Sequence, residues 1–228
     1  GLPLLFDPGT AWNYSFAVDV LGRVIEVVSG MPFERFLAER VFGPLGMTDT
    51  GFWVPEDDRD RVAALYAAGP AGGLTLIDAG EAALRRPEVP SGGAGLISTA
   101  GDYHRFLQML LRGGELDGVR VLGPRTVAYM TRNHLPGGRD LAGCTRVPFS
   151  EAVPGEGFGL GFAVVGDAAA GKNIASEGEY HWGGAPSTVC WVDPAEEITV
   201  VFLTQVTGFG ARRIRTRLRQ LVHQAIIS

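Results

Sequence analysis

Lysine and cysteine are scarce in this chain, and both shortages limit its chemistry. Lys172 is the only lysine, although the chain carries 20 basic and 25 acidic residues. Cys144 and Cys190 are too few for a disulfide framework, so we expect both thiols to be unpaired. The net charge of −5 argues against nucleic acid as a partner. Lysine-based chemistry therefore has a single candidate within this sequence.

Long apolar runs and metal-binding motifs are also missing. No apolar stretch approaches the ~20 residues that a membrane helix needs, so we expect no membrane partner. The glycine-rich stretch 91–96 lacks the lysine of a phosphate loop. Four histidines lie in separate contexts, without the short spacing of zinc motifs: His104, His134, His181 and His223. We therefore expect no metal and no cofactor.

Helical periodicity is clear near the start of the chain. The length of 228 residues suits one large domain or two small ones, and the hydrophobic fraction of 46% is ordinary for a globular protein with a sizeable core. Apolar residues recur every three or four positions from 17 to 28, and Gly30 is a typical stop. Pro32 is expected to begin a second helix, and Pro44 and Gly46 are expected to end it.

The middle of the chain is predicted to alternate helices with loops. Thr99 and Asp102 have the spacing of a capping box and should open a helix. A shorter helix is predicted at 124–130. Residues 52–95 are rich in glycine, proline and aspartate, which indicates an irregular excursion with short strands, a candidate lid.

Strands dominate the C-terminal part before a last helix. We predict strands at 157–162, 178–183, 189–192 and 198–203, where apolar or alternating residues lie between turn residues. The last helix is expected to bury its apolar residues and to expose its arginines to solvent. The apolar set is Ile214, Leu218, Leu221, Val222 and Ala225, and the basic set is Arg212, Arg213, Arg215, Arg217 and Arg219.

The stretch 178–188 is the first candidate for a functional site. Its predicted strand ends on Gly183 and Gly184, and paired glycines there allow a ligand to approach the backbone closely. A partner is available far away in the sequence, where Tyr14 follows a turn and precedes a helix. Plain core positions remain open as alternatives for both Tyr14 and Trp182.

Four segments, in this order, resemble the serine β-lactamase and penicillin-binding-protein superfamily. They are 8–15 with Tyr14, 36–47, 91–99, and the strand motif His181-Trp182-Gly183-Gly184. The likeness is greatest to the esterase branch, the family VIII carboxylesterases, with class C β-lactamases further off. The resemblance implies a β-lactamase-like α/β fold with an antiparallel sheet, flanking helices and a mostly helical lobe. Residues 1–155 would be a mostly helical part of that lobe with an irregular insertion, and 156–228 would supply three C-terminal strands and the final helix of the same domain.

The resemblance also implies roles for six residues. Tyr14 would act as general base, and the backbone N–H of Ala185 would belong to the oxyanion hole. Trp182 would form an apolar wall for the acyl group, while Gly183 and Gly184 let a small-molecule ester lie against the strand. Phe16 stands where class C enzymes carry asparagine, and Trp182-Gly183 stands where they carry Lys-Thr. Both departures favour an esterase over a strong β-lactamase.

The family's nucleophile is absent from the sequence. It lies in a Ser-x-x-Lys motif upstream of the tyrosine motif, but the residue three before Lys172 is Ala169. We therefore expect this chain to be the C-terminal portion of a larger enzyme, with Gly1 at a surface-loop nick or simply at the start of the recorded part. The N-terminal portion carrying Ser-x-x-Lys would be its partner. Two alternatives stay open: an acyltransferase on the same scaffold, and a non-catalytic binding protein.

Overall fold

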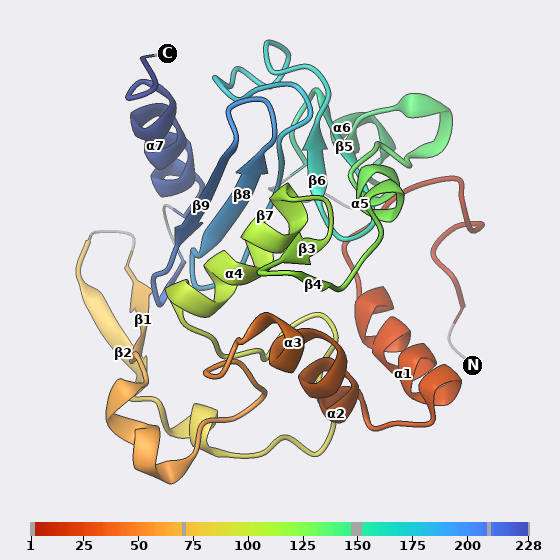
Figure 1. Cartoon of the computed structure of the whole chain (residues 1–228). Helices are drawn as coiled ribbons and strands as arrows, with labels where there is room; N and C mark the ends of the chain where they lie inside the picture. Colours follow the sequence, from red (N-terminus) through yellow and green to blue (C-terminus); the bar gives the residue numbers. More distant parts are fainter. Residues whose placement is uncertain (1–2, 70–71, 147–151, 209–210, 228) are drawn as a thin grey trace.

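The centre of the molecule is a five-stranded antiparallel sheet with the strand order β5-β6-β7-β8-β9 (Figure 1). The computed structural model describes residues 3–69, 72–146, 152–208 and 211–227. The strands are β5 (Glu156–Phe158), β6 (Ala163–Val165), β7 (Tyr180–Gly183), β8 (Val189–Asp193) and β9 (Ile198–Phe202). The mixed α/β fold and the three strands between 178 and 203 are therefore confirmed.

The single strand predicted at 157–162 is wrong. The chain forms β5, turns at Gly161 with φ +103°, and returns as β6. A side chain at Gly159 would lie 2.2 Å from the carbonyl oxygen of Met130, so this glycine allows a close backbone approach. The period-two pattern of glycine and bulky residues thus reflects a tight hairpin rather than one strand.

Helices α4 (Ala100–Leu111) and α7 (Ala211–His223) lie on opposite faces of the sheet. Side chains alternate along β8, so Cys190 and Val192 join the buried cluster that includes α4, while Trp191 points the other way. The Trp191 ring stacks on His223 of α7 with a centroid distance of 6.5 Å. Each face of the central sheet therefore has its own helix.

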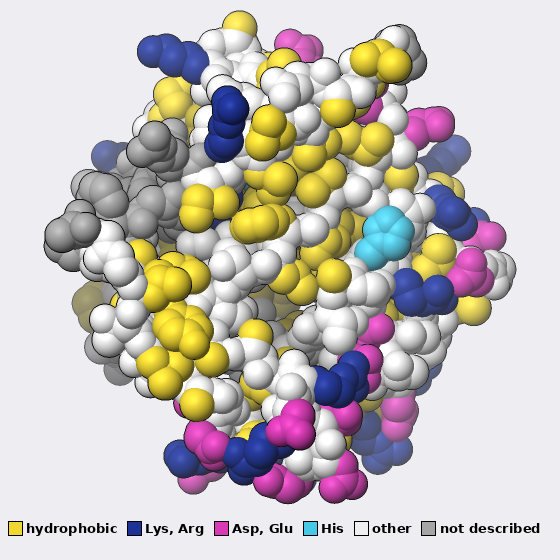
Figure 2. All heavy atoms as spheres, turned by 90° about the vertical axis from the view of Figure 1, so that its left-hand side faces the viewer, with side chains coloured by type: hydrophobic (Ala, Val, Ile, Leu, Met, Phe, Trp, Pro, Cys, Tyr) yellow, Lys and Arg dark blue, Asp and Glu magenta, His cyan; other side chains and the backbone are white. Residues whose placement is uncertain are grey.

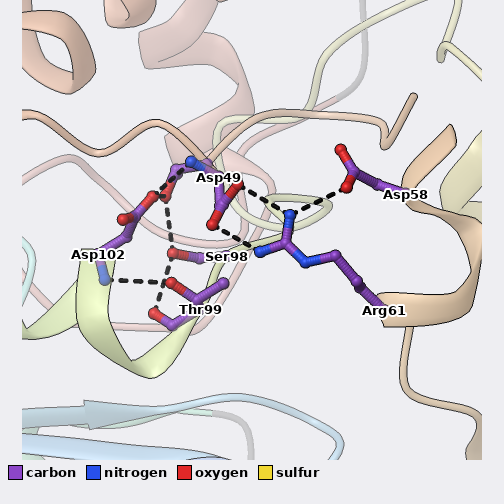
Figure 3. A network of polar contacts seen from close by, with 7 residues as sticks. Asp49, Asp58, Arg61, Ser98, Thr99 and Asp102 are labelled. Carbon is purple, nitrogen blue, oxygen red and sulfur yellow. Dashed lines mark hydrogen bonds and ion pairs between the residues drawn. The ribbon is translucent and has the colours of Figure 1, made fainter.

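Helix α4 begins at the predicted cap. The Thr99 hydroxyl accepts a hydrogen bond from the Asp102 N–H at 3.2 Å, as in a capping box. The Asp102 carboxylate instead accepts bonds from the N–H of Asp49 and the hydroxyl of Thr50, both at 2.8 Å. Figure 3 shows this network together with Arg61, which contacts Asp49 from the adjoining segment. The helix start is thus tied to the loop at 49–50.

The N-terminal helices follow the predicted boundaries closely. Helix α1 spans Ala17–Ser29 and ends at Gly30, whose φ is +68°. Helix α2 (Phe33–Leu37) continues through a π-helical turn, η1 (Ala38–Phe42), into α3 (Gly43–Leu45). Pro44 lies inside this run and does not end it, because the regular hydrogen-bond ladder is already interrupted by the π turn. The run ends at Gly46.

The predicted orientation of α7 is wrong in part: Arg217 is exposed and Leu218 and Val222 are half-buried as expected, but other positions are reversed. Arg219 and His223 are buried, whereas Ile214 and Leu221 are each 43% exposed. The sheet beneath the helix carries three buried carboxylates, Glu156 and Glu179 and Asp193, and these attract its basic side. Arg212 and Arg213 lie where side chains are outside the described part, so their exposure stays a prediction.

The remaining elements surround this core. A small sheet in the order β10-β1-β2 joins the 52–95 excursion to the segment after β9; β1 and β10 are parallel. The elements are η2 (Glu56–Arg61), β1 (Leu65–Ala68), β2 (Leu74–Asp78), η3 (Glu81–Leu84), β3 (Glu115–Leu116), β4 (Val119–Arg120), α5 (Pro124–Met130), η4 (Pro136–Gly138), α6 (Leu141–Cys144) and β10 (Val206–Gly208). Both cysteines are buried and free, as expected.

Two apolar surfaces are left uncovered. On α1 the predicted apolar stripe is exposed, including Val20, Leu21, Val24 and Val28. Strand β9 forms one edge of the central sheet. Figure 2 shows the face with α7, β9 and the β1–β2 hairpin, where apolar side chains gather across the middle and charged ones lie mostly around them. Within the described ranges, the helices are too short or too polar to cross a membrane.

Candidate active site

The turn between β7 and β8 has a fixed backbone. The Gly184 N–H donates to the carbonyl oxygen of Thr188 at 3.1 Å and to its hydroxyl at 3.0 Å. Ser187, at φ +69°, donates its hydroxyl to the carbonyl oxygen of Val206 at 2.7 Å. The Val206 N–H donates in return to the carbonyl oxygen of Pro186 at 3.1 Å. The start of β10 therefore holds the turn, and Ala185 is exposed at its tip.

The segment with Tyr14 is anchored on the end of α6. The Trp12 N–H donates to the carbonyl oxygen of Cys144 at 3.1 Å, and the Arg146 N–H donates to the side chain of Asn13 at 3.3 Å. Asp140 caps α6 by accepting from Gly143, and it also accepts from Gly155. The N–H groups of Gly155 and Gly143 hold the pKa of the Asp140 carboxyl below its usual range. This cap stabilises the end of α6, to which the segment that carries Tyr14 is hydrogen-bonded.

Tyr14 and Trp182 meet across the site. Their rings stack with centroids 6.2 Å apart and an interplanar angle of 23°. Trp182 also contacts Phe158 edge-on at 5.4 Å, and Phe158 contacts Trp12 at 5.0 Å. Tyr14 is 55% exposed, so the core alternative for this tyrosine is wrong. The fold thus joins the two candidate segments through an aromatic cluster.

A cleft of ≈ 370 Å³ lies between this cluster and α7. Five of the six predicted site residues line it, whereas Phe16 is 84% exposed next to α1 and is not among the lining residues. None of the described lining residues is a serine or a cysteine, the usual nucleophiles of acyl transfer. They are Tyr14, Val153, Glu156, Gly171, Lys172, Asn173, His181, Trp182, Gly183, Gly184, Ala185, Val189, Trp191, Arg215, Thr216 and Arg219.

Helix α7 contributes a residue that sequence reasoning missed. Arg215 donates from Nη2 to the carbonyl oxygen of Gly184 at 2.6 Å. A side chain on Gly183 would lie 2.6 Å from the guanidinium carbon of Arg215, so this glycine makes room for the arginine. The arginine spacing of the helix was visible in the sequence, but nothing in it indicated which arginines face the sheet.

Behind the cleft lies a buried cluster of charged groups. Glu179 forms an ion pair with Arg219 at 2.6 Å and a hydrogen bond with His223 at 3.2 Å, and His181 lies 3.3 Å from Glu156. Burial raises the pKa of Glu179 to about 8; Arg219 opposes this shift, and the carboxylates of Asp193 and Glu156 add to it. Burial also lowers the pKa of His223.

The same cluster contains one group of potential metal ligands. Ligand atoms of Glu179, Asp193 and His223 lie within 4.8 Å of one another. The Arg219 guanidinium already sits against Glu179 and supplies positive charge there. We therefore interpret the cluster as a buried network of charged groups that holds α7 against the sheet.

The geometry suits acyl transfer if a nucleophile is brought to the cleft. Tyr14 is 55% exposed and lines the cleft, and a phenolate at this position would accept a proton. Within the part of the chain that the structure describes, no hydrogen bond engages the Ala185 N–H, so it is available to a substrate oxygen. Trp182 and Phe158 provide an apolar wall beside both groups.

Comparisons with known proteins identify the family. The Beta-lactamase family model matches residues 1–224. Esterase EstB of Burkholderia gladioli is 34% identical over 227 residues, and Protein Rv1367c of Mycobacterium tuberculosis (strain ATCC 25618 / H37Rv) is 37% identical over 207 residues. These alignments cover 91% and 90% of this chain but 53% and 51% of the relatives, so the chain spans about half their length.

Solved structures agree with this assignment. EstCE1, described as a hydrolase with promiscuous acyltransferase activity, superposes with a TM-score of 0.81 at 30% identity, covering 97% of this chain and 58% of that one. Unliganded simvastatin synthase LovD from Aspergillus terreus gives a TM-score of 0.82 at 25% identity, covering 100% of this chain and 59% of its own. The chain therefore belongs to the Beta-lactamase family and has esterases and acyltransferases among its relatives.

Proposed function

We propose that this chain forms part of a serine carboxylesterase that hydrolyses small or medium esters through an acyl-serine intermediate. The observation that carries the proposal is the stacking of Tyr14 on Trp182 beside the available N–H of Ala185. In this proposal Tyr14 is the base, Trp182 the apolar wall for the acyl group and the Ala185 N–H the oxyanion donor, and it is supported by the fact that all three line one cleft. The esterase relatives support the same reaction class.

The reaction has two balanced steps. A serine oxygen attacks the ester carbonyl carbon while the Tyr14 phenolate accepts the hydroxyl proton, and the Ala185 N–H donates to the oxyanion that forms. The alkoxide leaves with that proton as the alcohol, and the acyl group stays on the serine. Water then attacks the acyl-serine, gives a proton to Tyr14, and the serine departs as its hydroxyl with that proton. The products are an alcohol and a carboxylic acid.

The nucleophile of this proposal comes from outside residues 1–228. No Ser-x-x-Lys occurs in the sequence, and no described lining residue is a serine or a cysteine. The exposed apolar stripe of α1 and the edge strand β9 are surfaces that a further portion of the protein would cover. A lysine of that portion next to Tyr14 would stabilise the phenolate.

Weak β-lactamase activity follows from the strand motif. Trp182 and Gly183 provide neither the ammonium nor the hydroxyl of Lys-Thr-Gly, so the strand itself offers no cation to the carboxylate of a β-lactam. The complete protein should turn over p-nitrophenyl butyrate at least ~10²-fold faster than nitrocefin in kcat/KM, since differential transition-state binding sets this ratio. Equal kcat/KM values would contradict the esterase assignment.

Tyr14→Phe tests the central assignment. In the complete protein it should lower kcat for p-nitrophenyl butyrate by about 10²-fold, the scale of general-base loss. Tyr129→Phe is the matched control, because Tyr129 is exposed and lies outside the cleft. Unchanged turnover in Tyr14→Phe would reject Tyr14 as the base.

An acyltransferase is the second candidate. Monacolin J acid methylbutanoyltransferase of Aspergillus terreus is 26% identical over 232 residues, covering 97% of this chain and 55% of its own. The two activities differ only in whether water or an alcohol takes the acyl group. Product analysis with p-nitrophenyl butyrate and added butanol separates them: the free acid supports the esterase, and butyl butyrate as main product supports the transferase. A complete protein inert to esters would favour a binding protein.

A further inference from the structure

Arg215 contacts the peptide that carries the predicted oxyanion donor. We propose that Arg215 is a positioning residue, which orients and polarises the Gly184–Ala185 peptide so that the Ala185 N–H points at the reacting carbonyl. This inference rests on the proposed function, because it concerns the same site. It assigns a task to a helix that otherwise only covers the sheet.

The planarity of the peptide unit makes the contact directional. The carbonyl of Gly184 and the N–H of Ala185 belong to one trans peptide and point in opposite directions. No peptide bond among the described residues is cis. Arg215 holds the carbonyl oxygen at 2.6 Å from the α7 side, so the N–H points away from α7. Fixing one end of the peptide thereby fixes the other.

The charge on Arg215 adds a second effect. A guanidinium stays protonated, so its hydrogen bond to the carbonyl is charge-assisted and shorter than a neutral one. Polarising a carbonyl draws electron density from the amide nitrogen of the same peptide, and linked hydrogen bonds strengthen one another. The Ala185 N–H therefore becomes a better donor to the oxyanion.

The position of Arg215 is itself fixed from two sides. It lies one helical turn before Arg219, and residues four apart share a helix face. Arg219 is buried and paired with Glu179, which anchors that face of α7 on the sheet. On the strand side, Gly183 leaves space for the guanidinium where it lies, because a Cβ at 183 would approach it to 2.6–2.8 Å and the guanidinium would have to shift. The buried ion pair between Arg219 and Glu179 thus fixes the part of α7 from which the Arg215 side chain extends to Gly184.

The turn does not depend on Arg215 alone, which limits the expected effect. The Ser187 N–H also donates to the Gly184 carbonyl oxygen, at 3.0 Å. Removing a direct oxyanion donor costs on the order of 10²–10³ in rate. Loss of a group that orients such a donor, with a second bond left in place, should cost less, about 10-fold.

The test compares two arginines of one helix in the complete protein. Arg215→Ala should lower kcat for p-nitrophenyl butyrate about 10-fold with KM within about 2-fold, since the oxyanion forms only in the transition state. Phenylboronic acid, which forms a tetrahedral adduct with a serine, should bind weaker by a similar factor. Arg217→Ala is the control, because Arg217 is exposed on the same helix. Arg215→Lys should recover part of kcat.

Gly183→Ala provides an independent route to the same result. Its Cβ would displace the guanidinium while the charge and the helix remain, so kcat and boronate affinity should fall together as in Arg215→Ala. Because Gly183 also borders the cleft, Arg215→Lys rather than Gly183→Ala decides the question if Arg215→Ala fails to fold.

Unchanged kcat and boronate affinity in both variants overturn the inference, as does an equal loss in Arg217→Ala. If the wild type turns over no ester, the proposed function fails and this inference fails with it. An active wild type with Tyr14→Phe impaired, but with insensitive Arg215 and Gly183 variants, overturns this inference alone.

Discussion

The two sides of strand β7 are built from opposite chemistry. Toward Tyr14 lies an aromatic cluster around Trp182, open to solvent. Toward α7 lies a buried set of carboxylates, histidines and arginines, with Glu179 and Asp193 fully buried. The side toward Tyr14, the open side, carries side chains that can contact a ligand. The side toward α7, the closed side, packs against the backbone of β7 and fixes its position. Arg215 connects the two through the Gly184 carbonyl.

This difference predicts that the closed side governs stability and the open side governs activity. The largest effect is expected for Arg219→Ala at pH 9, above the pKa of about 8 of Glu179, where this buried carboxyl is ionised and loses its cation; the variant also removes the guanidinium from the face of Trp191. Breaking a buried pair costs about 3–5 kcal/mol. Urea unfolding should show this loss, and Arg217→Ala should stay within about 0.5 kcal/mol.

A double variant separates the unpaired charge from lost packing. Adding Glu179→Gln to Arg219→Ala should recover part of the free energy of unfolding, because no unpaired carboxylate remains at 179. If the losses in free energy of unfolding of the two single variants simply add, Arg219 and Glu179 do not interact energetically. The claim that the closed side governs stability would then fail.

The converse holds for Tyr14→Phe. Its loss of about 10²-fold in kcat should come with a change below about 0.5 kcal/mol in the free energy of unfolding, because the side chain is exposed and only an oxygen is removed. Parallel activity assays and urea titrations check both halves. A large loss of stability would mean that Tyr14 is structural, and the two sides of β7 would no longer differ.

The smallest effect is a pH dependence on the closed side. The pKa of Glu179 is raised to about 8 in the folded state, so this group favours the folded state at low pH and loses that contribution as pH rises through 8. Between pH 7 and 9 the wild type should lose about 1 kcal/mol of stability that Glu179→Gln retains. The pKa of His223 is lowered, so its effect on stability falls at pH values below the ordinary pKa of histidine and outside the range from pH 7 to 9. Equal pH profiles would contradict the shift.

Local patterns allowed much of the fold to be predicted from the sequence. The apolar period of α1, its stop at Gly30 and the strands β7 to β9 depend on neighbours in the chain. The pairing of Tyr14 with Trp182 followed from a family resemblance, since nothing local links residues so far apart.

The wrong predictions concern residues whose environment depends on contacts with residues far away in the sequence. The arginine face of α7 was predicted to be solvated, but it meets carboxylates from separate strands. The 157–162 segment was predicted as one strand because its alternating pattern is typical of a strand. The close approach of Gly159 to Met130, which belongs to the hairpin, is a tertiary contact that the local sequence does not show. Phe158 joins the aromatic cluster for the same reason, and its role was not predicted.

The most direct test is to locate the acyl-accepting serine with a fluorophosphonate probe. Peptide mapping of the labelled complete protein should place the label on a serine of a Ser-x-x-Lys motif outside residues 1–228, and Tyr14→Phe should slow labelling by about 10²-fold. Residues 1–228 alone should remain unlabelled. A label on a residue of this chain, or equal labelling rates for wild type and Tyr14→Phe, would contradict the account.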